Sequence, residues 1–365
     1  MMGKNRNNKP FHFRGVRLSE IPQVPWLEKV LRAIKTFEVL VFKILQILDI
    51  YRPQKSIVGL PSLATRNFTL IQAAVYNGSQ EEVLGFKPRR LLYRILKGLP
   101  DLELFERVRF QLSVEENSMR SVEASTRTRG FIQLQLPWPV TPKAPRASWL
   151  RLTPQGVETF LGSIQLGEYE VLSAPVFFLN EKIKNIVISD IDDTIKESNI
   201  LETTGFKNIV SSIFKGNYYR YEAIEGMSDL YQSLNRPDTL IIYLTSTPFQ
   251  LTPFLLKFLR DNRFPEGPVF PRWLGYRKFT HKFRVLSKVL SQVERQKVYL
   301  VGDSGEEDLQ IYRRIAETPQ VGKAVEKILI RHVPGSVLPT LKSSREALYS
   351  EISALKMHFQ EILES

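Results

Sequence analysis

The chain has 365 residues, enough for two domains, and its 43% hydrophobic and 24% charged residues are typical of a globular protein. It has no cysteine and only four histidines, which excludes disulfides and thiolate zinc sites and leaves oxygen ligands, and hence Mg²⁺, as the expected metal chemistry. The formal net charge of +13 predicts attraction to polyanions such as phosphorylated compounds, anionic membranes or nucleic acids.

Residues 1–55 combine a basic arm with an apolar helical pattern between Trp26 and Ile50. Charged residues interrupt this pattern too often for it to span a bilayer. The arm also lacks the apolar core of a secretory signal, so we expect a cytoplasmic protein. The helix either packs onto the body of the protein or lies on a membrane surface, which would make the protein peripheral at the membrane.

Residues 56–180 show short alternating apolar runs, such as 108–114 and 132–136, separated by turn residues. This period of two predicts an antiparallel β-sandwich, interrupted by a helix near 88–99. No catalytic constellation occurs in this domain. We therefore expect it to support the rest of the chain or to bind a protein partner, whose identity the sequence leaves unknown.

Residues 181–340 have a different pattern. Four compact apolar runs, at 183–188, 240–244, 298–301 and 328–330, alternate with helical patterns. Such runs predict a parallel, Rossmann-like α/β sheet that is covered on both faces. Ligands of such sheets bind beyond the carboxyl ends of the strands. The remaining residues, 341–365, predict a terminal helix.

Asp190 and Asp192 directly follow the first of these strands. Residues two apart on an extended backbone point the same way, so we expect both carboxylates to face one point, with a cation relieving their repulsion. Asp190 can attack phosphorus and form an aspartyl-phosphate. Asp192 can then protonate the leaving oxygen and later activate water. Taken alone, such an acidic run is more often the cap of the next helix. Its place at the end of a buried strand makes the two interpretations about equally frequent.

Three further polar clusters follow in chain order. Thr245 and Ser246 end the second strand, where hydroxyl groups can hold a phosphoryl oxygen or simply cap a helix. Lys282 opens a helical pattern and can neutralise both nucleophile and phosphate. Asp303 and Asp308 lie in a glycine-flanked loop after the third strand and can complete a Mg²⁺ shell. The combination indicates phosphoryl transfer, since three of the four clusters end predicted strands.

In order and residue type, these four motifs resemble those of the haloacid dehalogenase superfamily of phosphotransferases. The resemblance implies that Asp190 is the nucleophile and Asp192 the general acid/base. It also implies that Thr245, with Ser246 as a competitor, binds phosphate, and that Lys282 is the motif-three lysine. The Mg²⁺ ligands implied are Asp190, the backbone carbonyl of Asp192, Asp303 and Asp308.

Longer runs, at 188–196, 243–251 and 301–312 with the pairs 267–268 and 281–282, resemble the actin-patch-type phosphatidate phosphatase family. The resemblance covers roughly residues 183–333 and implies phosphatidate, or a related lipid phosphate, as the substrate. The run Thr245-Ser246-Thr247 departs from the family's more frequent Ser-Asn-Ser. Threonine keeps the hydroxyl group, so the departure bears on the neighbouring pocket.

Only 51 positions separate Thr194 from Thr245, and 37 separate Thr245 from Lys282. We therefore expect a minimal cap and an open site, which suits a bulky or membrane-embedded phosphomonoester. The basic, aromatic stretch 272–279 is placed to meet an anionic membrane surface or to form an ordinary loop.

Two other interpretations of the chain stay open: a phosphatase for polynucleotide ends or small phosphorylated metabolites, and a non-catalytic adaptor. The complete set of motif acids argues against the adaptor. A nucleic acid is not among the partners we expect.

Overall fold

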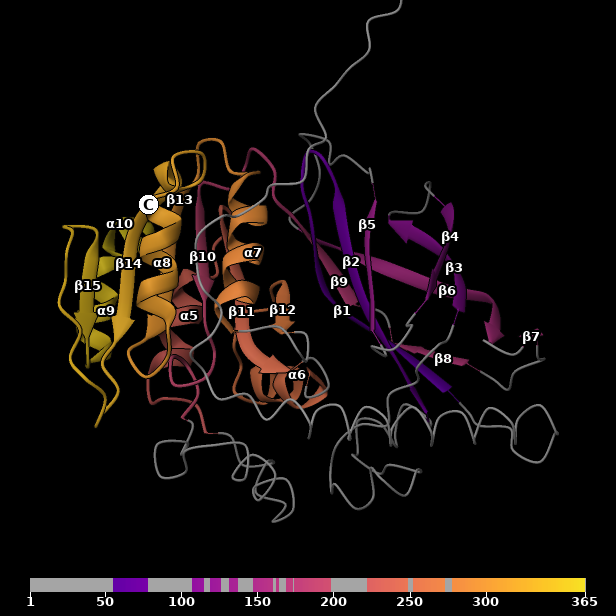
Figure 1. Cartoon of the computed structure of the whole chain (residues 1–365), viewed down its shortest axis with the longest axis horizontal. Helices are drawn as coiled ribbons and strands as arrows, with labels where there is room; N and C mark the ends of the chain where they lie inside the picture. The colour runs from indigo at the N-terminus through magenta and orange to yellow at the C-terminus, as the bar shows by residue number, and fades with distance from the viewer. Residues whose placement is uncertain are drawn as a thin grey trace, which may run out of the picture.

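The computed structural model describes residues 55–77, 107–114, 119–125, 131–136, 147–159, 162–163, 169–172, 174–197, 222–248, 252–272 and 278–364 (Figure 1). The predicted helices at 26–50 and 88–99 lie outside these ranges, as does most of the basic stretch 272–279. Part of the segment that would form the cap, residues 198–221, lies outside them too, so the minimal cap stays a prediction. No helix within the described ranges is both long and apolar enough to cross a membrane.

The N-terminal part of the structure is a nine-stranded sheet. Its strands are β1 (Lys55–Ala64), β2 (Thr69–Asn77), β3 (Arg107–Val114), β4 (Met119–Ser125), β5 (Phe131–Leu136), β6 (Ala147–Thr159), β7 (Gly162–Ser163), β8 (Tyr169–Leu172) and β9 (Ala174–Phe178). Their order is β4-β3-β6-β9-β1-β2-β5, with β7 paired to β6 and β8 to β1. Pairing is antiparallel except that β1 runs parallel to β8 and β9. These strands form one hydrogen-bonded sheet, so the two-layer sandwich stays a prediction.

The second sheet confirms the predicted parallel α/β architecture. It consists of β10 (Asn185–Ser189), β11 (Thr239–Pro248), β12 (Val269–Arg272), β13 (Lys297–Asp303), β14 (Val325–Arg331) and β15 (Glu346–Tyr349). The strand order is β12-β11-β10-β13-β14-β15, and every neighbouring pair is parallel. All six carboxyl ends therefore lie at one edge. The four apolar runs of the sequence are β10, β11, β13 and β14, whereas β12 and β15 were not predicted.

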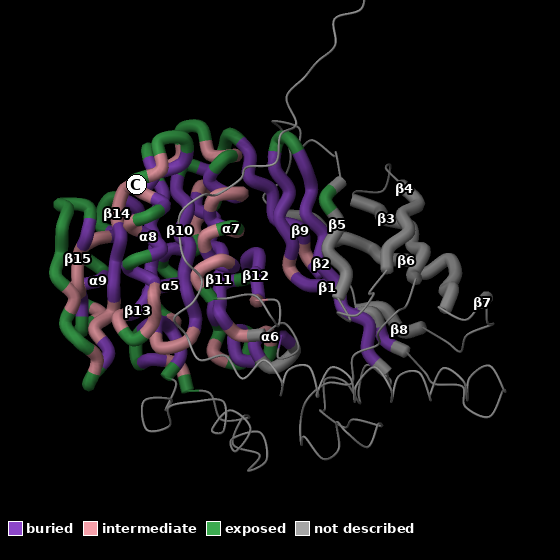
Figure 2. Tube along the Cα trace, in the orientation of Figure 1, coloured by how far each residue is buried: buried purple, intermediate pink, exposed green. Residues whose placement is uncertain are grey.

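Helices cover both faces of this sheet, and their bounds are α5 (Met227–Leu234), α6 (Thr252–Asp261), α7 (Lys278–Leu290), α8 (Asp308–Ala316), η4 (Gly322–Ala324), α9 (Ile352–His358) and α10 (Gln360–Glu364). Successive strand residues alternate between two cores: Ile186 and Ile188 pack with α7 and α8, whereas Val187 packs with α5, α6, α9 and α10. Burial on both faces explains why the strands are continuously apolar (Figure 2).

The predicted single helix at the C-terminus is wrong at its start, because residues 346–349 form β15 before α9 and α10 begin. Leu348 and Tyr349 face opposite cores, which is the alternation of a strand. Glu346 is buried and accepts hydrogen bonds from Arg313 of α8 at 2.9 and 2.6 Å. The ion pair between Arg313 and Glu346 thus joins α8 to β15, the sixth strand of the sheet.

The nine-stranded sheet is docked on the helix that follows β12. Phe68, in the turn between β1 and β2, joins the core shared with α7, and the ammonium of Lys288 lies 5.0 Å from its ring centroid. Asn67 donates to Gln292 Oε1 at 2.7 Å. Gln72 of β2 donates to the carbonyl of Val269 at 2.9 Å, so contacts reach both α7 and β12.

Replacing Gly267 with alanine should destabilise the α/β domain by about 3 kcal/mol or more, because the new Cβ would lie 2.0 Å from the backbone oxygen of Ile241. Gly335→Ala is the matched control. Nothing lies within 4 Å of its Cβ position, and its cost, about 1–2 kcal/mol, comes from a φ of 83° alone. Thermal unfolding would measure both. Equal losses would contradict the steric account.

Candidate active site

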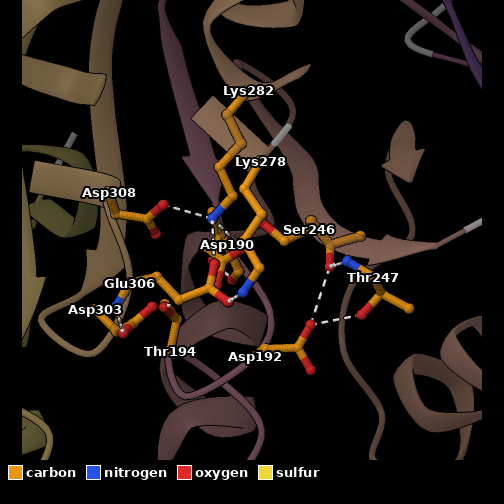
Figure 3. Close-up of polar contacts among 12 residues, drawn as sticks. Asp190, Asp192, Thr194, Ser246, Thr247, Lys278, Lys282, Asp303, Glu306 and Asp308 are labelled. Carbon is orange, nitrogen blue, oxygen red and sulfur yellow. Dashed lines mark hydrogen bonds and ion pairs between the residues drawn. The ribbon is translucent and has the colours of Figure 1, made fainter. Parts of the chain in front are cut away.

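The residues predicted to carry chemistry meet at the carboxyl edge of the six-stranded sheet (Figure 3). Asp190 follows β10, Asp303 ends β13 and Thr245 lies in β11, while α8 begins at Asp308. Lys282 does not open its helix as predicted. Helix α7 begins at Lys278, so Lys282 lies one turn further along and points from α7 toward this edge.

The centre of the site is a buried ammonium between two buried carboxylates. Lys282 Nζ lies 2.7 Å from Asp190 Oδ1 and 2.5 Å from Asp308 Oδ1, and all three side chains are almost fully buried. Burial alone would lower the pKa of Lys282, but Asp190 and Asp308 raise it well above its ordinary value. Lys282 is therefore a permanent cation, able to hold the charge of a nucleophile and of a phosphate.

A short chain of hydrogen bonds fixes the backbone of Asp190. Its N–H donates to the carbonyl of Val301 in β13 at 2.9 Å, which continues the sheet ladder past the end of β10. Ser189 Oγ donates to the Asp190 carbonyl at 2.6 Å, and the buried Tyr231 hydroxyl donates to Ser189 Oγ at 2.7 Å. The carboxylate of Asp190 is thus presented by a rigid support.

Beyond Asp190 the chain turns sharply. Asp193 has a φ of 57°, a conformation that aspartate tolerates better than most residues, and its carbonyl accepts a hydrogen bond from Arg331 at 3.0 Å. The N–H of Lys196 donates back to the carbonyl of Ile191 at 3.0 Å. This turn brings Lys196 next to Asp192, four residues earlier.

Asp192 lies in a second polar group, separate from Asp190. It forms an ion pair with the buried Lys196, and it accepts hydrogen bonds from Thr245 Oγ1 at 3.1 Å and Thr247 Oγ1 at 2.6 Å. Burial works to raise the pKa of Asp192, but Lys196 and the two hydroxyl groups outweigh it and lower the pKa to about 2. The expectation that both carboxylates share one cation is therefore wrong: the turn after Asp190 gives Asp192 its own partner.

The two candidate phosphate-binding hydroxyls differ in position. Strand β11 continues through Pro248, so the alternative that this run merely caps a helix is wrong. Thr245 and Thr247 both reach Asp192, and the backbone N–H of Thr247 donates to Thr245 Oγ1 at 2.9 Å. Ser246 Oγ is buried with no hydrogen-bond partner among the described residues, while its carbonyl accepts from Arg272 at 2.7 Å. Of the two candidates, Thr245 is therefore the one whose hydroxyl contacts Asp192.

Three acids form a cluster suited to a metal ion. Asp190, Asp303 and Asp308 are buried, and each offers an oxygen within 4.8 Å of those of the other two. Asp303 Oδ1 accepts from the N–H groups of Gly305 at 2.6 Å and Glu306 at 3.0 Å. Asp303 Oδ2 and Asp308 Oδ2 are buried without any hydrogen-bond donor among the described residues. Such oxygens cost free energy unless a cation or a proton satisfies them.

The charges around this cluster do not balance. The three acids and Glu306 face the ammonium groups of Lys282 and Lys278, which leaves a formal excess of two negative charges. Burial, followed by Asp308 and Glu306, raises the pKa of Asp303 to about 8. One divalent cation would match the excess. The residues present therefore fit an oxygen-bound divalent cation, which Asp190, Asp303 and Asp308 would hold.

Gly302 allows the last of these acids to approach. A Cβ at this position would lie 2.4 Å from Asp308 Oδ2 and 2.9 Å from Tyr312 Cε2. The glycine at the penultimate position of β13 is thus required by close packing against Asp308 and Tyr312.

Sequence reasoning gave no role to Lys196, Thr247, Glu306 or Lys278, all of which belong to the site. Thr247 lies two residues after Thr245 on the same strand face, a period-two signal available in the sequence. Glu306 contacts Lys282 at 3.6 Å and forms an ion pair with Lys278, one helical turn before Lys282. The Asp192–Lys196 pair has the spacing of four that commonly brings opposite charges together.

A comparison with protein families matches residues 185–332 to the family described as "Phosphatidate phosphatase APP1, catalytic domain". The matched segment contains every site residue named above.

The α/β domain of this chain belongs to the APP1 catalytic-domain family.

Two curated fungal proteins are similar to part of this chain. An uncharacterised protein of Schizosaccharomyces pombe is 28% identical over 142 residues, which cover 36% of this chain and 22% of that protein. Phosphatidate phosphatase APP1 of Saccharomyces cerevisiae is 30% identical over 139 residues, which cover 36% of this chain and 23% of that protein. The match thus spans less than a quarter of the length of either relative.

Among solved structures, a haloacid-dehalogenase-family hydrolase of Deinococcus radiodurans with bound phosphate and sodium matches with a TM-score of 0.31 and 12% identity. The match covers 50% of this chain and 97% of the other.

Mg²⁺ should release protons when it binds to the APP1-type domain at pH 7, because Asp303, with a pKa of about 8, holds a proton in the metal-free state. The affinity of the domain for Mg²⁺ should weaken as the pH falls below about 8. Calorimetry in buffers of different ionisation enthalpy measures both quantities.

In Asp303→Asn the amide oxygen can still accept from Gly305 and Glu306. The proton of residue 303 is lost, so fewer protons should be released on binding, and the affinity should fall at least about tenfold. Asp261→Asn, an exposed acid on α6, is the control. Undiminished proton release in the Asp303 variant would contradict this assignment.

Proposed function

We propose that the chain is a Mg²⁺-dependent phosphatase that hydrolyses phosphatidate, or a closely related lipid phosphate, through an aspartyl-phosphate on Asp190. The observation that carries the proposal is the buried Asp190–Lys282–Asp308 arrangement at the carboxyl edge of a domain of the APP1 family. The substrate rests on the name of the yeast relative, a phosphatidate phosphatase.

In the first half-reaction Asp190 attacks the phosphorus of the substrate. Its Oδ1 is held by Lys282 at 2.7 Å, whereas the one hydrogen bond of Oδ2 to a described residue is a long contact of 3.4 Å with the hydroxyl of Thr194. Oδ2 is therefore the oxygen with a lone pair available for attack. The new bond joins it to phosphorus, the ester P–O bond breaks, and the lipid alkoxide leaves. Mg²⁺ bound by the acidic cluster would offset the negative charge that nucleophile and phosphate bring together.

Asp192 transfers the proton that the leaving oxygen needs. With a pKa of about 2 it is ionised in the substrate-free site, so the proton for the leaving oxygen must enter with the substrate. A phosphomonoester supplies it as its monoanion, since the second pKa is about 6. Like charge from the bound phosphate raises the pKa of Asp192 and favours the transfer. Thr245 is placed to turn its hydroxyl from Asp192 to a phosphoryl oxygen.

In the second half-reaction the ionised Asp192 takes a proton from water, and the hydroxide formed attacks the phosphorus of the aspartyl-phosphate. The bond between phosphorus and Asp190 breaks, inorganic phosphate leaves, and the carboxylate of Asp190 is restored. Lys282 stays charged throughout, so it stabilises the intermediate on Asp190 as well as the free carboxylate.

Asp190→Asn should abolish phosphate release from phosphatidate in detergent micelles with Mg²⁺, by at least about 10³-fold, because the amide is not a nucleophile. EDTA should abolish release by the unmodified chain. Asp261→Asn, the same substitution at an exposed position of α6, should leave the rate unchanged.

The outcomes separate the chemistry from the substrate. Full activity in a folded Asp190→Asn variant would refute the nucleophile. Release from an aryl phosphate but not from phosphatidate would keep the mechanism and replace the lipid by a polynucleotide end or a small metabolite.

Asp192→Asn should slow hydrolysis of phosphatidate by about 10²- to 10⁴-fold, because its alkoxide leaving group needs a proton. An aryl phosphate, whose leaving group is stable without one, should lose much less in the first half-reaction, seen as a burst of released phenol. The amide oxygen can still accept from Thr245 and Thr247, so these two hydrogen bonds are kept. Equal losses for both substrates would remove the general-acid role.

A further inference from the structure

Two exposed apolar side chains lie close to one another in the segment that joins β14 to β15. Val337 is 88% exposed and Leu338 is 64% exposed, in the run Pro334-Gly335-Ser336-Val337-Leu338-Pro339. Among the described residues, only Leu341 and Met357 are other large apolar side chains that are similarly exposed. Adjacent exposed valine and leucine have a hydrophobic cost in water that suggests a partner surface.

Val337 and Leu338 form a tip that is attached to the edge of the sheet where Asp303 lies. Arg331, the last residue of β14, lies opposite Asp303 in the sheet register. Ser304, which follows Asp303, accepts the backbone N–H of Val333 at 2.9 Å, and its hydroxyl lies 2.6 Å from that of Ser336. Val337 is the next residue. One hydrogen bond and two peptide units therefore connect the tip to Asp303.

The segment that carries the tip is basic. Between residues 331 and 345 the chain contains Arg331, Lys342 and Arg345, besides His332, and no acidic residue. Lys342 and Arg345 are exposed, whereas Arg331 is half-buried and donates to the carbonyl of Asp193. Apolar side chains flanked by basic ones are the combination that binds the boundary of an anionic bilayer, since the apolar groups enter the acyl region and the cations remain among the headgroups.

We propose that Val337 and Leu338 insert into an anionic lipid surface and hold the carboxyl edge of the domain against it. This inference rests on the proposed lipid substrate, whose acyl chains stay in the bilayer, so that the site has to come to the phosphate. Because Ser304 and Ser336 connect the tip to Asp303, insertion places the acidic cluster close to the headgroups.

A single-site label tests the contact directly, since the chain has no native cysteine. V337C, carrying a polarity-sensitive fluorophore on its thiol, should shift to the blue when vesicles of phosphatidylcholine with phosphatidylserine are added. Met357, on α9, is 67% exposed, and the same label in M357C should shift much less. An unchanged spectrum of the V337C label, at vesicle concentrations that bind the chain, would overturn the proposal.

The double variant V337S/L338S tests the consequence. Loss of one valine and one leucine from the lipid should weaken binding to the same vesicles by about 10- to 100-fold. Hydrolysis of phosphatidate in vesicles should fall with it, while hydrolysis of a water-soluble aryl phosphate should not change. Both residues are exposed, so folding should be retained, and M357S is the matched control.

Vesicle binding is measured with phosphatidylserine, so it does not depend on turnover. If the unmodified chain binds through the tip but does not hydrolyse phosphatidate, the proposed substrate fails and the surface stands. If V337S/L338S binds as tightly as the unmodified chain, another segment provides the contact and the proposal fails. If hydrolysis of the soluble aryl phosphate fell by the same factor, the tip would contribute to the structure of the active site, and the proposal would also be overturned.

Discussion

The ammonium of Lys282, buried between Asp190 and Asp308, is the constraint on which the arrangement of this domain depends. Charges removed from water are tolerated only when partners lie within contact distance, and loss of one partner costs about 3–5 kcal/mol. The three residues come from α7, from the end of β10 and from the start of α8. Packing on both faces of the sheet must therefore hold these elements in register before the ions can meet.

The acids of the site fall into two groups whose pKa values are shifted in opposite directions. Asp303, crowded by carboxylates, has its pKa raised to about 8, whereas Asp192, paired with Lys196 and two hydroxyl groups, has its pKa lowered to about 2. Both residues are aspartates, so environment alone separates a carboxyl group that lacks a cation from one that already has a cationic partner. This separation supports the proposed assignment of metal-binding and acid/base roles.

Helix α7 lies between two sheets, and this position links the N-terminal part of the chain to the site. Its apolar residues share one core with strand residues of the α/β domain and with Phe68 of the nine-stranded sheet. Hydrogen bonds from Asn67 to Gln292 and from Gln72 to Val269 secure the same boundary. The nine-stranded sheet thus supports the helix that carries Lys282.

The sequence by itself determined the parallel sheet and the meeting of Asp190, Thr245, Lys282, Asp303 and Asp308 at its edge. Buried strands are marked by local apolar runs, and chain direction puts their carboxyl ends together. Only the tertiary structure decided that Asp192 pairs with Lys196 and Thr247, that β12 and β15 extend the sheet, and that β1 has parallel neighbours. Those features depend on contacts between side chains and edges from separate elements, and such contacts leave no periodic signal in the sequence.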